Sequence, residues 1–118
     1  MTEVELKNRT KSFALRIIKL VNSLPRNLVA DTIGKQLLRS GTSVGANYRA
    51  ACLGKSQADF IAKLGIVQEE SDESTYWMEL LIDSGTIAID KIGLLKKESE
   101  EITAIITASI ITSRKNKK

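Results

Sequence analysis

The sequence contains no histidine, one cysteine and one proline in 118 residues, and aromatic residues make up only 4% of it. Without histidine, the chain cannot carry a Ser-His-Asp or Cys-His catalytic arrangement, nor the Glu-x-x-His pairs that hold two irons in many helical bundles. Cys52 has no partner for an internal disulfide, which favours a reducing compartment. We therefore expect a cytoplasmic protein that is not an enzyme and holds no cofactor or metal.

Membrane segments are not expected either. The N-terminus lacks the basic and then apolar regions of a signal peptide. The longest uncharged stretch, Ile102 to Ser113, is far shorter than the ~20 apolar residues that span a bilayer. The remaining composition, 42% hydrophobic and 27% charged, is typical of a globular domain whose aliphatic side chains favour packed helices.

Charge is unevenly distributed along the chain, whose net charge is +4. Residues 1–55 hold 10 basic and 3 acidic side chains, residues 56–101 hold 4 basic and 11 acidic, and residues 102–118 hold 4 basic and none acidic. Such segregation suits helices of opposite sign that lie side by side, with a basic tail left over.

Apolar residues recur at three- and four-residue steps in four stretches, which is the spacing of amphipathic helices. We predict helices at residues 4–23, 28–53, 57–83 and 90–113. Pro25 ends the first, Asn27 caps the second, and Ser56 with Asp59 forms a capping box for the third. The short connections predict an all-α, antiparallel up-down-up-down four-helix bundle over residues 1–113, followed by a basic tail at 114–118.

The stretch from Arg39 to Cys52 reads as a loop by composition, because it holds two glycines, two serines and one threonine. Its neighbours favour a helix, in which Gly41 and Gly45 share one face. In a hairpin that turns near Lys55, residues whose numbers sum to about 110 lie level. Gly45 would then face Gly65 at a close crossing, and Arg39 would lie beside Glu70 and Glu73.

Basic residues give the strongest functional signal, and they form two groups. The first helix and the C-terminal tail carry them: Lys7, Arg9, Lys11, Arg16 and Lys19, then Arg114, Lys115, Lys117 and Lys118. The start of the first helix and the end of the fourth lie at one end of such a bundle, so we expect the groups to converge there. Three interpretations stay open: a solvated surface, RNA or DNA binding through phosphates without base reading, or a protein partner with an acidic surface.

Other polar groups suggest less. The carboxylates of Glu69, Glu70, Asp72 and Glu73 could in principle bind a hard cation, but a solvated or arginine-paired helix face is the commoner outcome. Ser40, Thr42 and Ser43 lack an evident base. Tyr76 and Trp77 fit either the margin of the core or a subunit interface.

Several segments together resemble a known family. They are RTKSFALRIIKL from Arg9, SLP from Ser23, QLLRSGTSVGANYRAA from Gln36, KSQADFIAKL from Lys55 and EESDESTYWMELL from Glu69. In order and spacing they are similar to the four-helix bundle proteins encoded in intervening sequences of bacterial large-subunit ribosomal RNA genes, and to the accessory variability proteins of diversity-generating retroelements.

The resemblance implies a left-handed antiparallel bundle that assembles as a homopentamer, with Tyr76 or Trp77 at the subunit contact. For the retroelement relatives it also implies a basic surface that binds nucleic acid and a reverse transcriptase, whereas the role of most members is unknown. Ala50 departs from the family, because many members have glutamate at this position. Any ion pair made by that glutamate is absent here.

Overall fold

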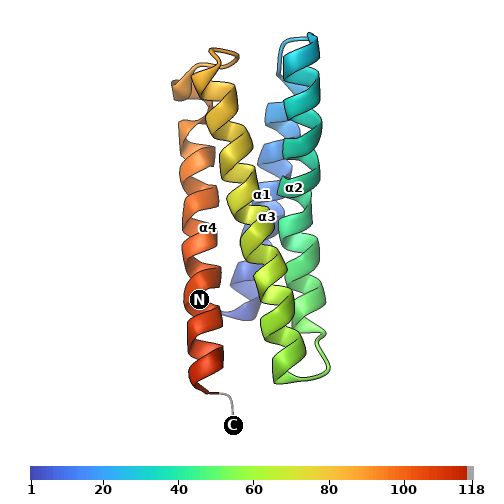
Figure 1. The fold of residues 1–118 in the computed structure, drawn as a ribbon, viewed down its shortest axis with the longest axis vertical. Helices are drawn as coiled ribbons and strands as arrows, with labels where there is room; N and C mark the ends of the chain where they lie inside the picture. The colour runs from blue at the N-terminus through green and yellow to red at the C-terminus, as the bar shows by residue number, and fades with distance from the viewer. Residues whose placement is uncertain (117–118) are drawn as a thin grey trace.

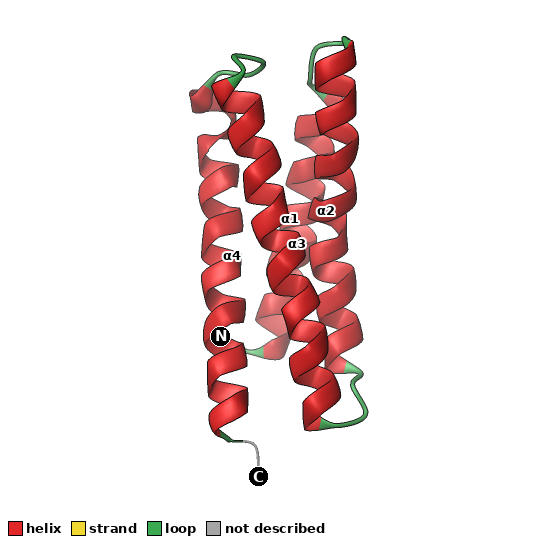
Figure 2. Cartoon of the chain, viewed as in Figure 1, coloured by secondary structure: helices red, strands yellow, loops and turns green. Residues whose placement is uncertain are grey.

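The computed structural model describes residues 1–116 as four antiparallel helices in one elongated bundle (Figure 1). The helices are α1 (Glu3–Asn22), α2 (Leu28–Cys52), α3 (Gln57–Asp83) and α4 (Ile89–Lys115). The bundle measures 51 × 20 × 19 Å, and loops join each helix to the next at alternate ends (Figure 2). The predicted all-α up-down-up-down architecture is confirmed, and α2 continues as a helix through Gly41 and Gly45.

Side-chain caps fix where the second and third helices begin. The Asn27 side chain accepts a hydrogen bond from the backbone N–H of Ala30, and the Ser56 hydroxyl accepts one from Asp59 N–H. These are the caps that the sequence predicts, and each stabilises its helix by about 1 kcal/mol.

Glycine has two different uses in the loops. Gly85, just after α3, has a φ of 73°, a left-handed conformation that disfavours any side chain. Gly54, after α2, is not left-handed. A Cβ there would lie 2.9 Å from the Ala51 carbonyl oxygen, so steric crowding requires glycine at this point.

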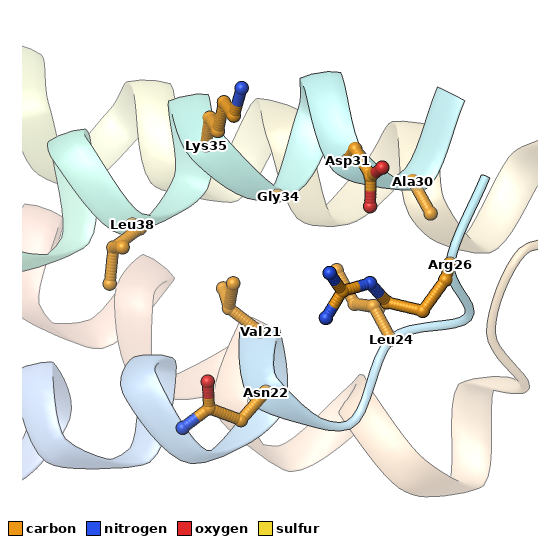
Figure 3. Close-up of a pocket in the computed structure, with 9 residues that line it drawn as sticks. All are labelled: Val21, Asn22, Leu24, Arg26, Ala30, Asp31, Gly34, Lys35 and Leu38. Carbon is orange, nitrogen blue, oxygen red and sulfur yellow. The ribbon is translucent and has the colours of Figure 1, made fainter. Parts of the chain in front are cut away.

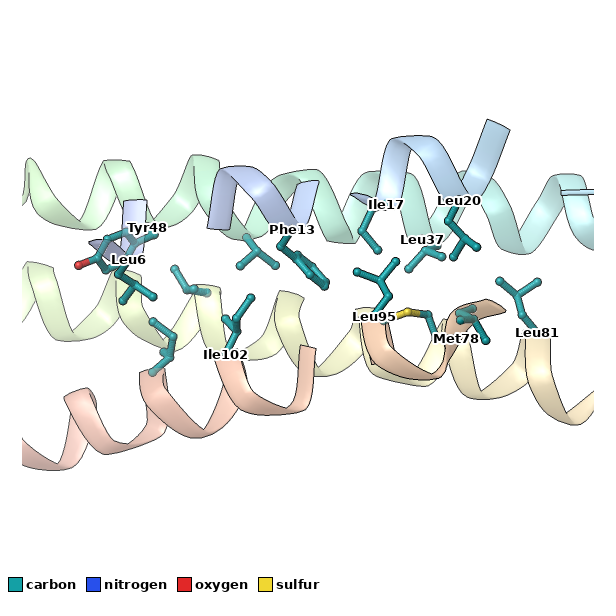
Figure 4. Close-up of a cluster of buried hydrophobic side chains, with 14 of the residues drawn as sticks. Leu6, Phe13, Ile17, Leu20, Leu37, Tyr48, Met78, Leu81, Leu95 and Ile102 are labelled. Atoms are coloured by element: carbon teal, nitrogen blue, oxygen red, sulfur yellow. The ribbon is translucent and has the colours of Figure 1, made fainter. Parts of the chain in front are cut away.

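The core runs the length of the bundle and receives side chains from all four helices (Figure 4). Its fully buried members are mostly aliphatic, and the largest include Phe13, Ile17, Leu37, Leu64, Met78, Leu81, Ile92, Ile102 and Ile106. Burial of each such side chain contributes about 1.5–3 kcal/mol. Among the four pairs of neighbouring helices, α1–α4 contacts least extensively and α2–α3 most extensively.

The glycine face of α2 packs against α1, not against α3. A Cβ on Gly41 would lie 2.8 Å from the Ile17 side chain, and one on Gly45 would lie 3.2 Å from Thr10 Oγ1. A Cβ on Gly65 would meet nothing within 4 Å. The predicted crossing of Gly45 and Gly65 is therefore wrong. The register of a hairpin predicts which residues lie at the same height, but it does not predict which neighbouring helix a given face packs against.

Hydroxyl groups line the α3–α4 contact in the middle of the bundle. Thr75 and Ser99 share a hydrogen bond of 2.6 Å between their hydroxyl oxygens, and Ser71 bonds to Thr103 in the same layer. Among the described residues, every buried side-chain polar atom has a hydrogen-bond partner. The polar layer is therefore fully satisfied, as stable buried networks must be.

The fourth helix extends beyond its predicted end. It continues to Lys115, and Asn116 caps it. Arg114 and Lys115 therefore belong to the last helical turn and not to a separate tail. In that turn their positive charges interact favourably with the negative end of the helix dipole.

Candidate nucleic-acid interface

The five cations of α1 point in three directions. Lys7 and Lys11 are one turn apart and lie against α2, where both line the same hollow. Arg9 and Arg16 are seven residues apart and lie toward Glu98 of α4. Lys19 is exposed, and around the axis of α1 it lies between the directions of Lys11 and Arg16. The first helix therefore presents no single basic face.

Arg9 is neutralised by α4. Its Nε donates to Glu98 Oε2 at 2.7 Å, its Nη2 donates to Glu98 Oε1 at 2.8 Å, and the same Nη2 reaches Glu101 Oε2 at 2.9 Å. The hydrogen bond from Arg9 lowers the pKa of Glu98 despite partial burial, and the charge of Arg16 adds to the effect. An arginine held by two carboxylates is a poor candidate for phosphate contact.

The predicted convergence of α1 with the end of α4 is also wrong. The start of α1 and the end of α4 do lie in the same half of the bundle (Figure 1). However, Arg9 lies level with Glu101, and Arg114 lies about 20 Å further along α4 at 1.5 Å per residue. Arg114 and Lys115 therefore stand apart from the α1 cations, and Lys117 lies outside the described residues.

Three cations from two helices instead meet in the groove between α1 and α2. A hollow of about 450 Å³ there, called the Lys11 hollow below, has long cationic side chains and a floor of small residues. Its lining is Lys7, Asn8, Thr10, Lys11, Ala14, Thr42, Gly45, Ala46 and Arg49. No carboxylate is among these residues. The site therefore favours an anion.

A second hollow of about 340 Å³ lies in the same groove near the α1–α2 loop, and Figure 3 shows its lining. Arg26 and Lys35 contribute cations to this Arg26 hollow, but Asp31 contributes a carboxylate, and Val21, Leu24 and Leu38 make much of it apolar. The mixed lining favours an anion less than the Lys11 hollow does.

Within residues 1–116, neither Lys11 nor Arg49 has a carboxylate within ion-pair distance, and both are exposed. Lys7 is partly compensated by Glu3, whose carboxylate lies 3.2 Å from Lys7 Nζ and does not line the hollow. The uncompensated charge of the Lys11 hollow therefore comes from Lys11 and Arg49.

Sequence reasoning missed Arg49 and Asn8. The structure supplies the register that the sequence did not: Gly41 meets Ile17 and Gly45 meets Thr10, so residues of α1 and α2 whose numbers sum to about 57 lie level. Applied to α1 and α2, that register brings Arg49 opposite the start of α1, beside Lys7 and Lys11.

Arg39 of α2 lies beside Glu70 and Glu73 of α3, as the register of the α2–α3 hairpin predicts. Arg39 Nη1 is 3.0 Å from Glu70 Oε2, and Arg39 Nη2 pairs with Glu73. Glu73 also accepts a hydrogen bond of 2.9 Å from the indole N–H of Trp77. Trp77 is partly buried against the core, whereas the neighbouring Tyr76 is 52% exposed.

The thiol and hydroxyl groups in the second half of α2 are held protonated by burial or are hydrogen-bonded within their own helix. Burial raises the pKa of the Cys52 thiol and of the Tyr48 hydroxyl, which keeps both protonated. The hydroxyls of Thr42 and Ser43 donate to backbone carbonyls of their own helix, at 2.7 and 2.6 Å. In the described part of the chain, no group of three acidic or thiol side chains is placed to hold a metal.

The fold and its surface define a class: an antiparallel four-helix bundle with an anion-favouring groove between its first two helices. Residues 2–108 match the 23S rRNA-intervening sequence protein family, and the chain belongs to that family. No helix in the described residues is long and apolar enough to cross a membrane.

Similarity to a solved structure extends over both sequence and fold. The crystal structure of a protein of unknown function from the S23 ribosomal protein family of Bacteroides thetaiotaomicron VPI-5482 is 38% identical. The match covers 93% of this chain and 98% of the relative, with a TM-score of 0.81. No curated protein matches the chain.

Proposed function

We propose that the protein acts in the cytoplasm as a self-associating, non-enzymatic bundle that binds RNA or DNA through backbone phosphates. The observation that carries this proposal is the Lys11 hollow, where Lys7, Lys11 and Arg49 converge with no lining carboxylate. None of the residues that line either hollow is aromatic, so the groove offers no platform on which bases stack. Binding is therefore expected to be insensitive to sequence.

A salt series tests the proposal. Fluorescence titrations of single-stranded and duplex oligonucleotides of unrelated sequence would measure affinity from low to physiological ionic strength. Phosphate-driven binding weakens log-linearly with salt, by roughly one unit of slope per phosphate contacted, and is nearly equal for all sequences. Absence of binding at low salt by an intact assembly contradicts the proposal.

Self-association rests on a separate surface. Tyr76 is half exposed beside the partly buried Trp77, with ring centroids 5.2 Å apart, and aromatic residues of this kind are enriched at interfaces. The family resemblance supports a homopentamer. Light scattering would then give about five times the 13.0 kDa chain mass, and Tyr76→Glu would reduce it. A mass of one chain contradicts self-association.

A protein-interaction scaffold without nucleic acid is the second candidate. The outer side of α3 supports it, because four carboxylates are exposed there: Glu69, Asp72, Glu79 and Asp83. The apolar side chain of Ile66, one turn before Glu69, is exposed as well. A cationic protein partner suits this surface. On this second hypothesis, charge reversal at Asp72 and Glu79 would abolish binding of the cationic protein, and the unmodified chain would bind no oligonucleotide at low salt.

A further inference from the structure

We infer that the Lys11 hollow is a discrete phosphate-binding site, formed jointly by α1 and α2. This deepens the proposed function, on which it rests for nucleic acid as the source of the phosphate. The site differs from a diffuse basic surface because its donors come from two helices that the hairpin holds together. The three cations are Lys7 and Lys11 of α1, one turn apart, and Arg49 of α2.

Close helix approach sets the shape of the site. Gly45 brings the α2 backbone against Thr10, where even a Cβ would lie only 3.2 Å from Thr10 Oγ1. Ala14 and Ala46 place no long side chain in the hollow. Small residues therefore form the floor, and the long cations can extend over it toward a bound anion.

The donor chemistry suits phosphate. Arg49 offers a planar guanidinium that can contact two phosphate oxygens at once, and Lys11 offers a compact ammonium. Asn8 is exposed, and its side-chain amide makes no hydrogen bond within the described residues, so its N–H groups can donate to a ligand. Thr42 contributes no donor, because its hydroxyl proton is engaged by the Leu38 carbonyl at 2.7 Å.

Alternative cations are less suited. Arg9 is held by Glu98 and Glu101. Arg26 and Lys35 share their hollow with the carboxylate of Asp31. This contrast supplies a matched control in the same groove, because the Arg26 hollow also holds two exposed cations, one from the α1–α2 loop and one from α2.

The test compares two double variants that each remove two positive charges: Lys11→Gln with Arg49→Gln, and Arg26→Gln with Lys35→Gln. All four residues are exposed, so both variants are expected to fold. Inorganic phosphate is titrated against sodium chloride of the same ionic strength, and backbone amide shifts are followed in TROSY spectra of deuterated full-length protein. A short oligothymidylate provides the second arm.

We expect phosphate-specific shifts at Asn8, Lys11, Gly45 and Arg49. The first double variant should bind phosphate and oligothymidylate at least tenfold more weakly, and the second should bind both within twofold of the unmodified chain. Phosphate binding without oligothymidylate binding supports the site and overturns the proposed function. Oligothymidylate binding that both variants weaken equally supports the function and overturns the site, as do phosphate shifts spread over all cations.

Discussion

Arg9 of α1 holds Glu98 of α4 through two parallel hydrogen bonds, from Nε at 2.7 Å and from Nη2 at 2.8 Å. The pair joins the first and last helices of the bundle, which have the least extensive contact of the four neighbouring helix pairs. Both side chains are substantially shielded, with exposed fractions of 27% for Arg9 and 15% for Glu98. The arginine therefore serves the fold.

Loss of this pair should destabilise the protein in a pH-dependent way. Because Arg9 lowers the pKa of folded Glu98, the stabilisation is present above the unfolded pKa, and it is lost as pH falls through the folded pKa. Glu98→Gln should lower the free energy of unfolding by about 1–2 kcal/mol at neutral pH, and by much less at a pH below both values. Urea denaturation at both pH values measures this.

A matched control is Glu100→Gln, which changes a glutamate two residues further along α4. Glu100 is 54% exposed and pairs only with Lys96 in the same helix, so its replacement should cost less than about 0.5 kcal/mol. Equal losses for the two variants would show that the α1–α4 pair has no special role.

Two glycines should respond to alanine in opposite directions. Gly41→Ala places a Cβ 2.8 Å from the buried Ile17 side chain and should destabilise by about 1–3 kcal/mol. Gly65→Ala places a Cβ in open space within α3 and should stabilise by about 0.5–1 kcal/mol, because alanine favours helix. Denaturation midpoints compare the two, and destabilisation by both would return the close crossing to the α2–α3 contact.

Single substitutions on α1 should separate folding from binding. Lys11→Gln should reduce the salt slope of oligonucleotide binding by about one unit, since one phosphate contact is lost. Arg9→Gln should leave that slope unchanged, because Glu98 and Glu101 already neutralise Arg9. Fluorescence titration at several salt concentrations gives both slopes, and the converse pattern would refute the assignment of Lys11.

Trp77 should report the α2–α3 ion pair. It is the single tryptophan of the chain, and its indole N–H donates to Glu73, which also pairs with Arg39. Glu73→Gln should change the Trp77 emission spectrum while lowering stability by no more than about 1 kcal/mol, because Arg39 is 48% exposed. Glu69→Gln, on the outer side of α3, is the control that should leave emission unchanged.

Local features of the fold could be predicted from sequence because each depends on neighbouring residues. Asn27 and Ser56 cap the helices that follow them, as their side-chain chemistry favours. The pairing of Arg39 with Glu70 follows from constant rise in two helices joined by a short loop. These inferences need no knowledge of how the bundle is assembled.

The site could not be predicted in the same way. Placing Arg9 beside Glu98 requires the contact between the two ends of the chain, which no hairpin register supplies. Assigning Gly45 to α1 requires the rotation of α2 about its own axis, because a helix in a bundle has two neighbours. Periodicity defines an inward face, but it does not divide that face between those neighbours.

The unequal contact between helix pairs has a consequence for how the chain folds. The α2–α3 hairpin has the most extensive contact and only a short loop to close, so it can form early with little loss of chain entropy. The α1–α4 seam joins the most distant parts of the sequence and is expected to close last. Spontaneous opening of the native state should begin at that seam, and amide hydrogen exchange should be faster in α1 and α4 than in the middle of α2 and α3.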